Sequence, residues 1–468
     1  MSSHLSAETK LPSSVAMPGY DRNDLHPGIL HFGLGAFHRA HQGIHTQRAL
    51  QSEFGPWGIV AVNLRSPEPV EALAAQDGLY SITVRDSDGE TSEVVGATVD
   101  WLCAATDRER VLTYLASPFI HIVTLTVSEK AYGLHPSTGG LDETHPGIAN
   151  DLANPDAPVG AVGYLVAGLA SRRDKGMRPF TILCCDNLPS NGKVVRRLVL
   201  DMAERRDAEL AKWIREEVTF PSSMVDRIVP AATDDSRTRA KSLLGVEDML
   251  ALDTEPFMQW VIEDAFVSGR PAWEAGGALF VENVEPYEKM KLRLLNGSHT
   301  MIAHLGLLKG LECVRDVMAV PEFVAMTKDH MRAAAATLDP VPGIDLDFYM
   351  NQLIERFSNR AIAHRNIQIA MDSSQKLPQR IFSPAIEALA NGSDGGSFAR
   401  VVGLWIAALI RFNDCNDPRR DELLNAARTA DARDYTASFV AIDGLIPPQL
   451  AQSRAWRDLV SREVAAWL

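Results

Sequence analysis

A chain of 468 residues with 46% hydrophobic side chains is too long for one ordinary core, so we expect two domains. Its net charge of −14 disfavours nucleic-acid and anionic-membrane binding, since both require a positive field. Five scattered cysteines, a polar first stretch at 1–24 and the lack of any run of about 18 apolar residues favour a cytoplasmic protein without disulfides or membrane helices.

Strand-like and helix-like runs alternate in the first half of the chain, which predicts a doubly wound α/β domain. We expect strands at 29–32, 57–65, 119–129 and 179–187, antiparallel strands at 79–86 and 92–102, helices from 36 to about 50, at 66–76 and at 161–176, and a loop at 134–158.

Beyond about residue 286 the strand-like runs end and helical periodicity takes over, at 300–311, 321–338, 347–357, 396–412 and 452–468. The sequence therefore predicts an α/β domain at 1–285 and a mostly helical domain at 286–468. We expect the stretch 290–300 to face the cleft between them, because ligand sites favour such clefts.

Gly33 and Gly35 lie between an apolar strand and a helix, which is the context of a dinucleotide-binding turn. Glycine lets the backbone approach a pyrophosphate, and the N–H groups at the start of the helix can bind it. His38 replaces the third glycine of the G-x-G-x-x-G pattern, so a plain strand-to-helix turn is the alternative.

The second strand ends at Asn63-Leu64-Arg65-Ser66, without the carboxylate that would bind the adenosine ribose of NAD. Because Arg65 could hold a 2′-phosphate, we expect NAD as the cofactor and leave NADP open. The side chains and turns predicted to contact it here are Gly33, Gly35, Phe37, Arg39, Arg65, Glu129 and Lys130.

Five histidines crowd around this turn: His26, His31, His38, His41 and His45. The spacing of His41 and His45 suits metal ligands, but no Cys, Asp or Glu joins them locally and no H-E-x-x-H motif occurs. We expect no metal. The histidines should instead form hydrogen bonds beside the turn, with His38 and Arg39 facing cofactor phosphate or substrate.

The stretch MKLRLLNGSHT at 290–300 places polar side chains among leucines. At ~100° per residue, Glu288, Lys291, Asn296 and His299 fall in one sector about 140° wide that leucines share, while Arg293 points elsewhere. A lysine buried there has a lowered pKa and can act as a general base near neutral pH.

The other polar groups of this sector complete an alcohol-oxidising set. An asparagine can donate to an oxygen that gains negative charge, a histidine can orient a hydroxyl, and a glutamate can carry the proton to water. The set suits oxidation of a secondary alcohol to a ketone with hydride transfer to a nicotinamide, without a metal. Polar groups that satisfy one another across a domain interface are the alternative.

Four motifs, HFGLGAFHRAHQ, CDNLPSNG, TFPSSMVDRIVP and YEKMKLRLLNGSH, together resemble the polyol-specific long-chain dehydrogenases, the mannitol dehydrogenase family, over about 28–420. This resemblance implies a zinc-independent NAD(P)-dependent enzyme with a Rossmann-type dinucleotide-binding domain at 1–285 and a helical substrate-binding and catalytic domain at 286–468. It also implies the catalytic set: Lys291 as general base, Asn187 and Asn296 as the pair that stabilises the substrate oxygen, His299 to orient substrate, and Glu288 to relay the proton.

The resemblance further implies that Asp226 lies at the domain junction and helps to position cofactor or substrate. Asn187 also follows a strand at its carboxyl end, where α/β sheets place ligands, although a turn asparagine is the alternative.

The segment 359–380 indicates the substrate. Polyol-oxidising members tend to have N-P-x-x-x-D-x-x-x-R, whereas this chain has Arg360, His364 and Gln368 at the Pro, Asp and Arg positions. The segment resembles the fructuronate reductase, or mannonate oxidoreductase, branch. His364 beside Arg365 makes the local field more positive, which suits a substrate carboxylate. Alternatively, these groups pair with Asp372 or Glu355 and never meet substrate.

We therefore expect an oxidoreductase for a small sugar acid or polyol, with D-mannonate and D-fructuronate first and mannitol or arabinitol with its ketose second. A binding protein without chemistry would lack the lysine or the asparagine, and both are present. The oligomeric state, monomer or dimer, stays open.

Overall fold

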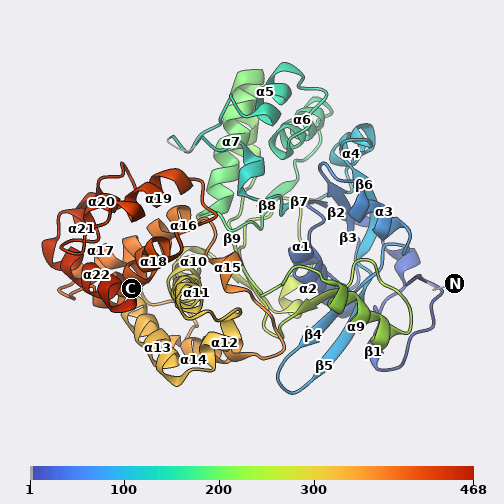
Figure 1. The fold of residues 1–468 in the computed structure, drawn as a ribbon. Helices are drawn as coiled ribbons and strands as arrows, with labels where there is room; N and C mark the ends of the chain where they lie inside the picture. The colour runs from blue at the N-terminus through green and yellow to red at the C-terminus, as the bar shows by residue number, and fades with distance from the viewer. Residues whose placement is uncertain (1–3, 136–137) are drawn as a thin grey trace. The chain divides into compact units, whose positions relative to one another are not determined.

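The computed structural model describes residues 4–135 and 138–468, and the chain divides into two compact units, Met1–Val284 and Glu285–Leu468 (Figure 1). Among the described residues, no helix is both long enough and apolar enough to cross a membrane.

The first unit is built around a five-stranded parallel sheet with the order β6-β3-β2-β7-β8. Its strands are β2 (Pro27–Phe32), β3 (Gly58–Asn63), β6 (Thr98–Cys103), β7 (Ile122–Leu125) and β8 (Thr181–Cys184). Counted along the chain, the order is 3-2-1-4-5, as in a Rossmann-type doubly wound fold whose direction of winding reverses between β2 and β7. The predicted fold class is confirmed.

Two smaller sheets belong to the same unit, with the orders β1-β5-β4-β10 and β12-β11-β9. Their strands are β1 (Val15–Ala16), β4 (Tyr80–Arg85), β5 (Glu90–Val95), β9 (Ser223–Asp226), β10 (Leu252–Thr254), β11 (Gln259–Glu263) and β12 (Ala278–Val281). The helices are α1 (Ala36–Ala40), α2 (Gln42–Ser52), α3 (Glu68–Ala74), α4 (Arg108–Leu115), α5 (Pro146–Ala153), α6 (Ala161–Asp174), α7 (Asn191–Arg206), α8 (Ala208–Glu217) and α9 (Asp234–Leu244), with short 3₁₀ turns η1 (Arg22–Asp24), η2 (Glu129–Tyr132) and η3 (Trp273–Gly276).

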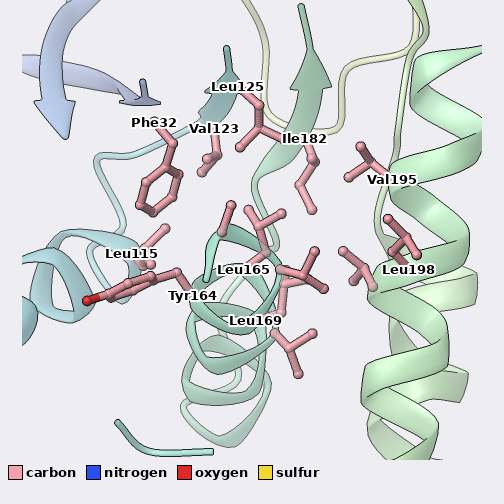
Figure 2. Close-up of a cluster of buried hydrophobic side chains, with 14 of the residues drawn as sticks. Phe32, Leu115, Val123, Leu125, Tyr164, Leu165, Leu169, Ile182, Val195 and Leu198 are labelled. Carbon is pink, nitrogen blue, oxygen red and sulfur yellow. The ribbon is translucent and has the colours of Figure 1, made fainter. Parts of the chain in front are cut away.

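Alternate residues of the parallel strands pack on opposite faces of the sheet. Figure 2 shows one face, where strand residues meet helices α6 and α7 in a buried cluster that includes Phe32, Val123, Leu125, Ile182, Leu165, Leu169, Val195 and Leu198. On the other face, Ile29, Ile122 and Leu183 pack with Leu50 of α2 and Trp260 of β11. Burial of both faces explains why these strands read as nearly continuous apolar runs.

Three sequence predictions fail in this unit. Gly96 divides the run 92–102, so β5 pairs antiparallel with β4 as predicted, whereas β6 instead joins the parallel sheet beside β3. The region predicted as a loop at 134–158 contains α5, which begins at Pro146, a residue tolerated in a first helical turn. The helix expected from 36 to 50 breaks at His41, whose φ of −128° and ψ of −83° are not helical.

Every residue of the second unit is described, and its elements are all helical, as the periodicity predicts. They are α10 (Glu285–Met290), η4 (Lys291–Asn296), α11 (Gly297–Lys309), α12 (Val314–Met318), α13 (Pro321–Ala335), α14 (Leu346–Ser358), α15 (Asn366–Ile369), α16 (Ser373–Leu377), η5 (Pro378–Phe382), α17 (Ser383–Ala390), α18 (Gly396–Phe412), α19 (Arg420–Arg428), α20 (Ala437–Val440), α21 (Pro448–Ala451) and α22 (Arg454–Trp467). The segments η4 and η5 are π-helical.

Candidate active site

A groove of about 420 Å³ opens at the carboxyl ends of β2, β3 and β7. It is lined by Gly33, Gly35, Asn63, Leu64, Arg65, Ser66, Thr126, Val127, Ser128, Lys130, Ala131 and His145. Doubly wound sheets bind their ligands at this place, where the winding reverses. The structure therefore brings four of the predicted cofactor residues together, namely Gly33, Gly35, Arg65 and Lys130.

The two glycines of the turn are glycines for different reasons. Gly33 has a φ of +105°, and a Cβ built on it would lie 2.0 Å from the carbonyl oxygen of Thr126. Gly35 has an ordinary φ of −85°, and the atom nearest to its Cβ position is 4.0 Å away. The fold therefore requires glycine at position 33 but not at position 35. The open space at Gly35 can admit a ligand group that binds close to the backbone.

Three other predicted cofactor residues, Glu129, Phe37 and Arg39, do not line this groove. Glu129 is exposed beside Lys130 in η2, and Phe37 stacks on His41 at 4.9 Å between ring centroids. The prediction that Arg39 faces cofactor phosphate or substrate is wrong. Its side chain is buried, donates a hydrogen bond to the carbonyl of Leu250 and lies over the Tyr80 ring, so it points into the interior rather than at the groove.

The histidines near the turn are packing groups. His31 lies 2.7 Å from Thr124 Oγ1 through Nδ1 and 2.9 Å from the Gly33 carbonyl through Nε2, and His38 stacks on it at 3.4 Å. Burial lowers the pKa of His31 to about 3 and that of His38 well below its usual value. His38 therefore does not face a phosphate as predicted. Among the described residues, no group of three or more His, Cys, Asp or Glu side chains could hold a metal ion.

A carboxylate that the sequence reasoning passed over fixes the loops after β7 and β8. Asp186 accepts hydrogen bonds from the N–H groups of Val127 and Ser128, at 3.0 and 3.1 Å, and from the Tyr132 hydroxyl at 2.7 Å. Asn187 follows it, exposed, and is held where β8 ends. The available signal was its position directly before the predicted Asn187. Asp226 is buried at the end of β9.

In the second unit, the stretch 290–300 is a helix with a π turn inside it. The N–H of Gly297 donates to the carbonyl of Leu292, an i→i+5 bond, so α10 and α11 are joined through η4. A helical wheel at α-helical spacing therefore misplaces residues beyond Lys291. π turns occur often at functional sites.

The predicted catalytic side chains of this stretch are buried or half-buried. Lys291 is 8% exposed and His299 6%, and Glu288 is buried as well. Asn296 is half-buried at the end of η4. Arg293 points to the far side, as predicted, where both its terminal nitrogens bind Glu387 at 2.6 Å.

His299 is surrounded by positive groups. Its ring packs on Phe357 at 4.4 Å and lies perpendicular to the ring of His364 at 5.2 Å. Burial holds the pKa of His299 well below its usual value, and His364, Arg356, Arg380 and Lys291 lower it further. Burial, with Lys376 nearby, lowers the pKa of His364 to about 4. Both histidines are neutral near pH 7.

Arg365, predicted beside His364 as a substrate contact, is exposed and points elsewhere. Its Nε lies 3.2 Å from Glu312 Oε1, an exposed ion pair that involves neither Asp372 nor Glu355. Its place near His299 is taken by Arg356 and Arg380, which the sequence reasoning did not select. Only the tertiary packing of α14 and η5 brings those two arginines to the site.

Comparison with known proteins agrees with this architecture. The sequence models of the mannitol dehydrogenase Rossmann domain and C-terminal domain match residues 27–275 and 283–461. The chain belongs to the mannitol dehydrogenase family. The family resemblance of the sequence motifs is thus confirmed, and the chain is an oxidoreductase of that family.

Relatives cover nearly the whole chain. D-mannonate oxidoreductase of Escherichia coli (strain K12) is 41% identical over 98% of this chain and 96% of its own length. Mannitol 2-dehydrogenase of Cereibacter sphaeroides is 38% identical over 97% and 96%. The solved ternary complex of Pseudomonas fluorescens mannitol 2-dehydrogenase with NAD and D-mannitol is 36% identical, with a TM-score of 0.88 over 99% of this chain and 96% of that one.

The buried histidines predict loss of stability in mild acid. Folding lowers the pKa of His31 to about 3 and of His304 and His330 to about 4, whereas an unfolded histidine titrates near ~6.5. The unfolded chain therefore binds more protons below that pH. Their stability contribution is complete above pH ~6.5 and falls with pH by up to ~1.4 kcal/mol per unit for each histidine. Urea unfolding from pH 7.5 to 5 measures this slope.

Two variants test whether buried histidines cause this dependence of the unfolding free energy on pH. His45 is buried, and burial holds its pKa well below the usual value, so His45→Gln should make the slope between pH 5 and 6.5 smaller by about one proton. His26 is exposed, and His26→Gln is the matched control for the substitution itself. Equal slopes in all three proteins would contradict this explanation.

Proposed function

We propose that this chain is an NAD-linked dehydrogenase that transfers hydride between a nicotinamide and the secondary alcohol or ketone carbon of an open-chain sugar acid, with D-mannonate and D-fructuronate as the substrate pair. Similar proteins support the reaction class, since one is a D-mannonate oxidoreductase and the solved mannitol 2-dehydrogenase holds NAD and D-mannitol. The family is one of NAD-dependent oxidoreductases of polyols and mannonate.

The groove of the first unit would hold the dinucleotide. Open space at Gly35 suits the pyrophosphate, and Arg65 and Lys130 add positive charge along the groove. Asn63 ends β3 where an acidic residue would bind the ribose of NAD, so NADP is the second candidate. When bound, the nicotinamide accepts hydride from an alcohol carbon or returns it to a ketone.

One observation carries the proposal. Within residues 4–135 and 138–468, the buried atoms His299 Nε2 and His364 Nδ1 have no hydrogen-bonding partner. An unsatisfied buried polar atom costs about 1–3 kcal/mol, so two of them beside Lys291 indicate a place built for a polar ligand. The hydroxyl groups of an open-chain sugar derivative supply donors at the required density.

Each polar residue of this site then has a separate role in the proposed reaction. Lys291 takes the proton of the reacting hydroxyl, and Glu288, one helical turn earlier, passes it toward water. Asn296 donates to the oxygen as its negative charge grows, the role that the family resemblance also implies for Asn187. His299, kept neutral by burial and its cationic neighbours, accepts a hydrogen bond from a second substrate hydroxyl and fixes the substrate's orientation.

The surrounding charge favours a sugar acid over a neutral polyol. Arg356 and Arg380 act electrostatically on His299, and Lys376 acts on His364. Such a field stabilises a carboxylate through charge-assisted hydrogen bonds. Mannitol with fructose, or arabinitol with its ketose, is the second candidate, supported by the similarity to mannitol 2-dehydrogenases.

The two glycines provide a matched test of the cofactor groove. Gly33→Ala should lower the free energy of unfolding by about 3 kcal/mol, because it combines a positive φ with a clash against the Thr126 carbonyl. Gly35→Ala should change it by less than ~1 kcal/mol yet weaken NADH binding about tenfold or more, since its methyl group occupies the ligand's space. Denaturant unfolding and NADH fluorescence measure both. Unchanged NADH affinity in Gly35→Ala would place the pyrophosphate elsewhere.

Removal of the base should stop turnover without loss of cofactor. Lys291→Ala should lower kcat by about 10²–10⁴-fold while NADH binds as in the unchanged protein, because only the proton acceptor is lost. Lys289→Ala is the control, since this half-exposed lysine, two residues away, pairs with Glu285 at 2.9 Å. Full activity in Lys291→Ala would show that the base is another group.

NADH and NADPH oxidation with fructuronate, fructose and xylulose tests the substrate. Fructuronate should lead, and His364→Asp should lower kcat/KM for fructuronate at least about tenfold relative to fructose, because a negative charge then faces the substrate carboxylate. Fructose or xylulose in the lead would make the protein a polyol dehydrogenase. No turnover of any of the three would contradict the proposed reaction.

A further inference from the structure

The π turn that carries Lys291 and Asn296 packs against a second π turn. The segment η5 shows the same i→i+5 bond as η4, from the N–H of Ser383 to the carbonyl of Pro378. Its sequence explains this, because Pro384 has no N–H to donate to the carbonyl of Arg380 four residues earlier. Gly297 allows the close approach, since a Cβ there would lie 3.3 Å from the Arg380 carbonyl and 3.1 Å from His330 Nε2.

Arg380 joins the two turns through its side chain as well. Its Nη1 donates to the carbonyl of Asn296 at 3.4 Å and to Thr300 Oγ1 at 3.3 Å, and Thr300 Oγ1 itself donates to the Asn296 carbonyl at 3.0 Å. The guanidinium thus sits at the residue where η4 ends and α11 begins. A fixed fork of donors is suited to holding such a junction.

The guanidinium of Arg380 also acts electrostatically on His299. His299, three residues after Asn296, has four charged or titratable neighbours that disfavour its protonation: His364 from the 359–380 segment, Arg356 from α14, Arg380 from η5 and Lys291 from η4. Arg293 of η4 is bound instead by Glu387 and is not among these neighbours of His299.

We propose that Arg380 is a positioning residue for the hydride-transfer reaction: it clamps the junction between η4 and α11 through the Asn296 carbonyl and Thr300, and so holds the side chains of Asn296 and His299 against the substrate. This inference rests on the proposed function. Arg380 need not touch the substrate, and a displacement of about 1 Å at the clamped groups is enough to lower turnover about 10²-fold.

Two variants separate geometry from charge. Arg380→Lys keeps the charge but has no planar fork, and Arg380→Ala removes both. Both should lower kcat about 10²-fold with KM and NADH affinity changed by less than about threefold, because the loss falls on the transition state. Added guanidinium ion should restore part of the kcat of Arg380→Ala but not that of Arg380→Lys.

The protonation of His299 gives a readout that needs no turnover. Its ring signal in an NMR titration, assigned through His299→Gln, should titrate at higher pH in Arg380→Ala, where a neighbouring positive charge is gone. In Arg380→Lys it should stay where it is in the unchanged protein. This titration tests whether the charge of Arg380 lies beside His299 even if no sugar is turned over, a result that would contradict the proposed function alone.

Arg293→Lys is the matched control for stability. It weakens the bidentate pairing of the buried Arg293 with the half-exposed Glu387, so it should lower the melting temperature while leaving kcat per folded molecule and the His299 titration unchanged. Arg380→Ala with normal kcat, or with a His299 titration like that of the unchanged protein, would overturn the inference. So would an Arg293→Lys variant that reproduces the whole Arg380→Ala pattern.

Discussion

The contact between Gly33 and Thr126 is the constraint on which the first unit depends. β2 and β7 run parallel with Phe32 opposite Leu125, and the N–H of Thr126 donates to the Phe32 carbonyl at 2.8 Å. The N–H of Gly33 donates to Val62 of β3 at the same distance. Three strand ends are thereby fixed within one hydrogen-bonded network. The residues that follow these strand ends line the groove.

Neutral histidine serves as a packing residue in both units. His31 combines hydrogen bonds to Thr124 and Gly33 with a stacked aromatic face, which neither a purely apolar nor a charged side chain could supply. His299 likewise packs its ring against Phe357, with cations nearby that keep it unprotonated. The two histidines differ in the hydrogen-bond partners of their ring nitrogens. Both ring nitrogens of His31 have partners, whereas Nε2 of His299 has none among the described residues.

The sequence predicts the parts of the fold that rest on local periodicity. Parallel strands buried on both faces, long amphipathic helices and the transition near residue 286 all follow from spacing alone. The break at His41 and the separation of β5 from β6 at Gly96 do not, because tertiary pairing decides them. In the sequence, a single glycine in an alternating run looks like a tolerated strand residue. Only the structure shows that the residues after it pair with a different strand.

The site was less predictable for a similar reason. Glu288, Lys291 and His299 are visible as polar residues on an apolar helix, but an α-helical wheel cannot anticipate the π turn. Arg39 and Arg365 looked suitable because they stand beside motif residues, yet Arg39 is buried and donates to the Leu250 carbonyl, and Arg365 pairs with Glu312. Adjacency in sequence says little about direction, since neighbouring side chains on a helix or an extended segment point to different sides.

In the proposed reaction, selectivity and reactivity come from different parts of the second unit. Lys291 and Glu288, for which we propose the proton-handling roles, lie on one continuous helix with a π turn. The positive charges near His299 and His364, which we propose distinguish a carboxylate from a neutral chain end, come from α14 and the 359–380 segment. A carboxylate entering this field gains charge-assisted hydrogen bonds that a terminal hydroxyl group cannot make, while the reacting carbon meets the same base in both cases. Changes in those peripheral charges can then shift substrate preference without altering hydride chemistry, because specificity is a difference between two binding energies.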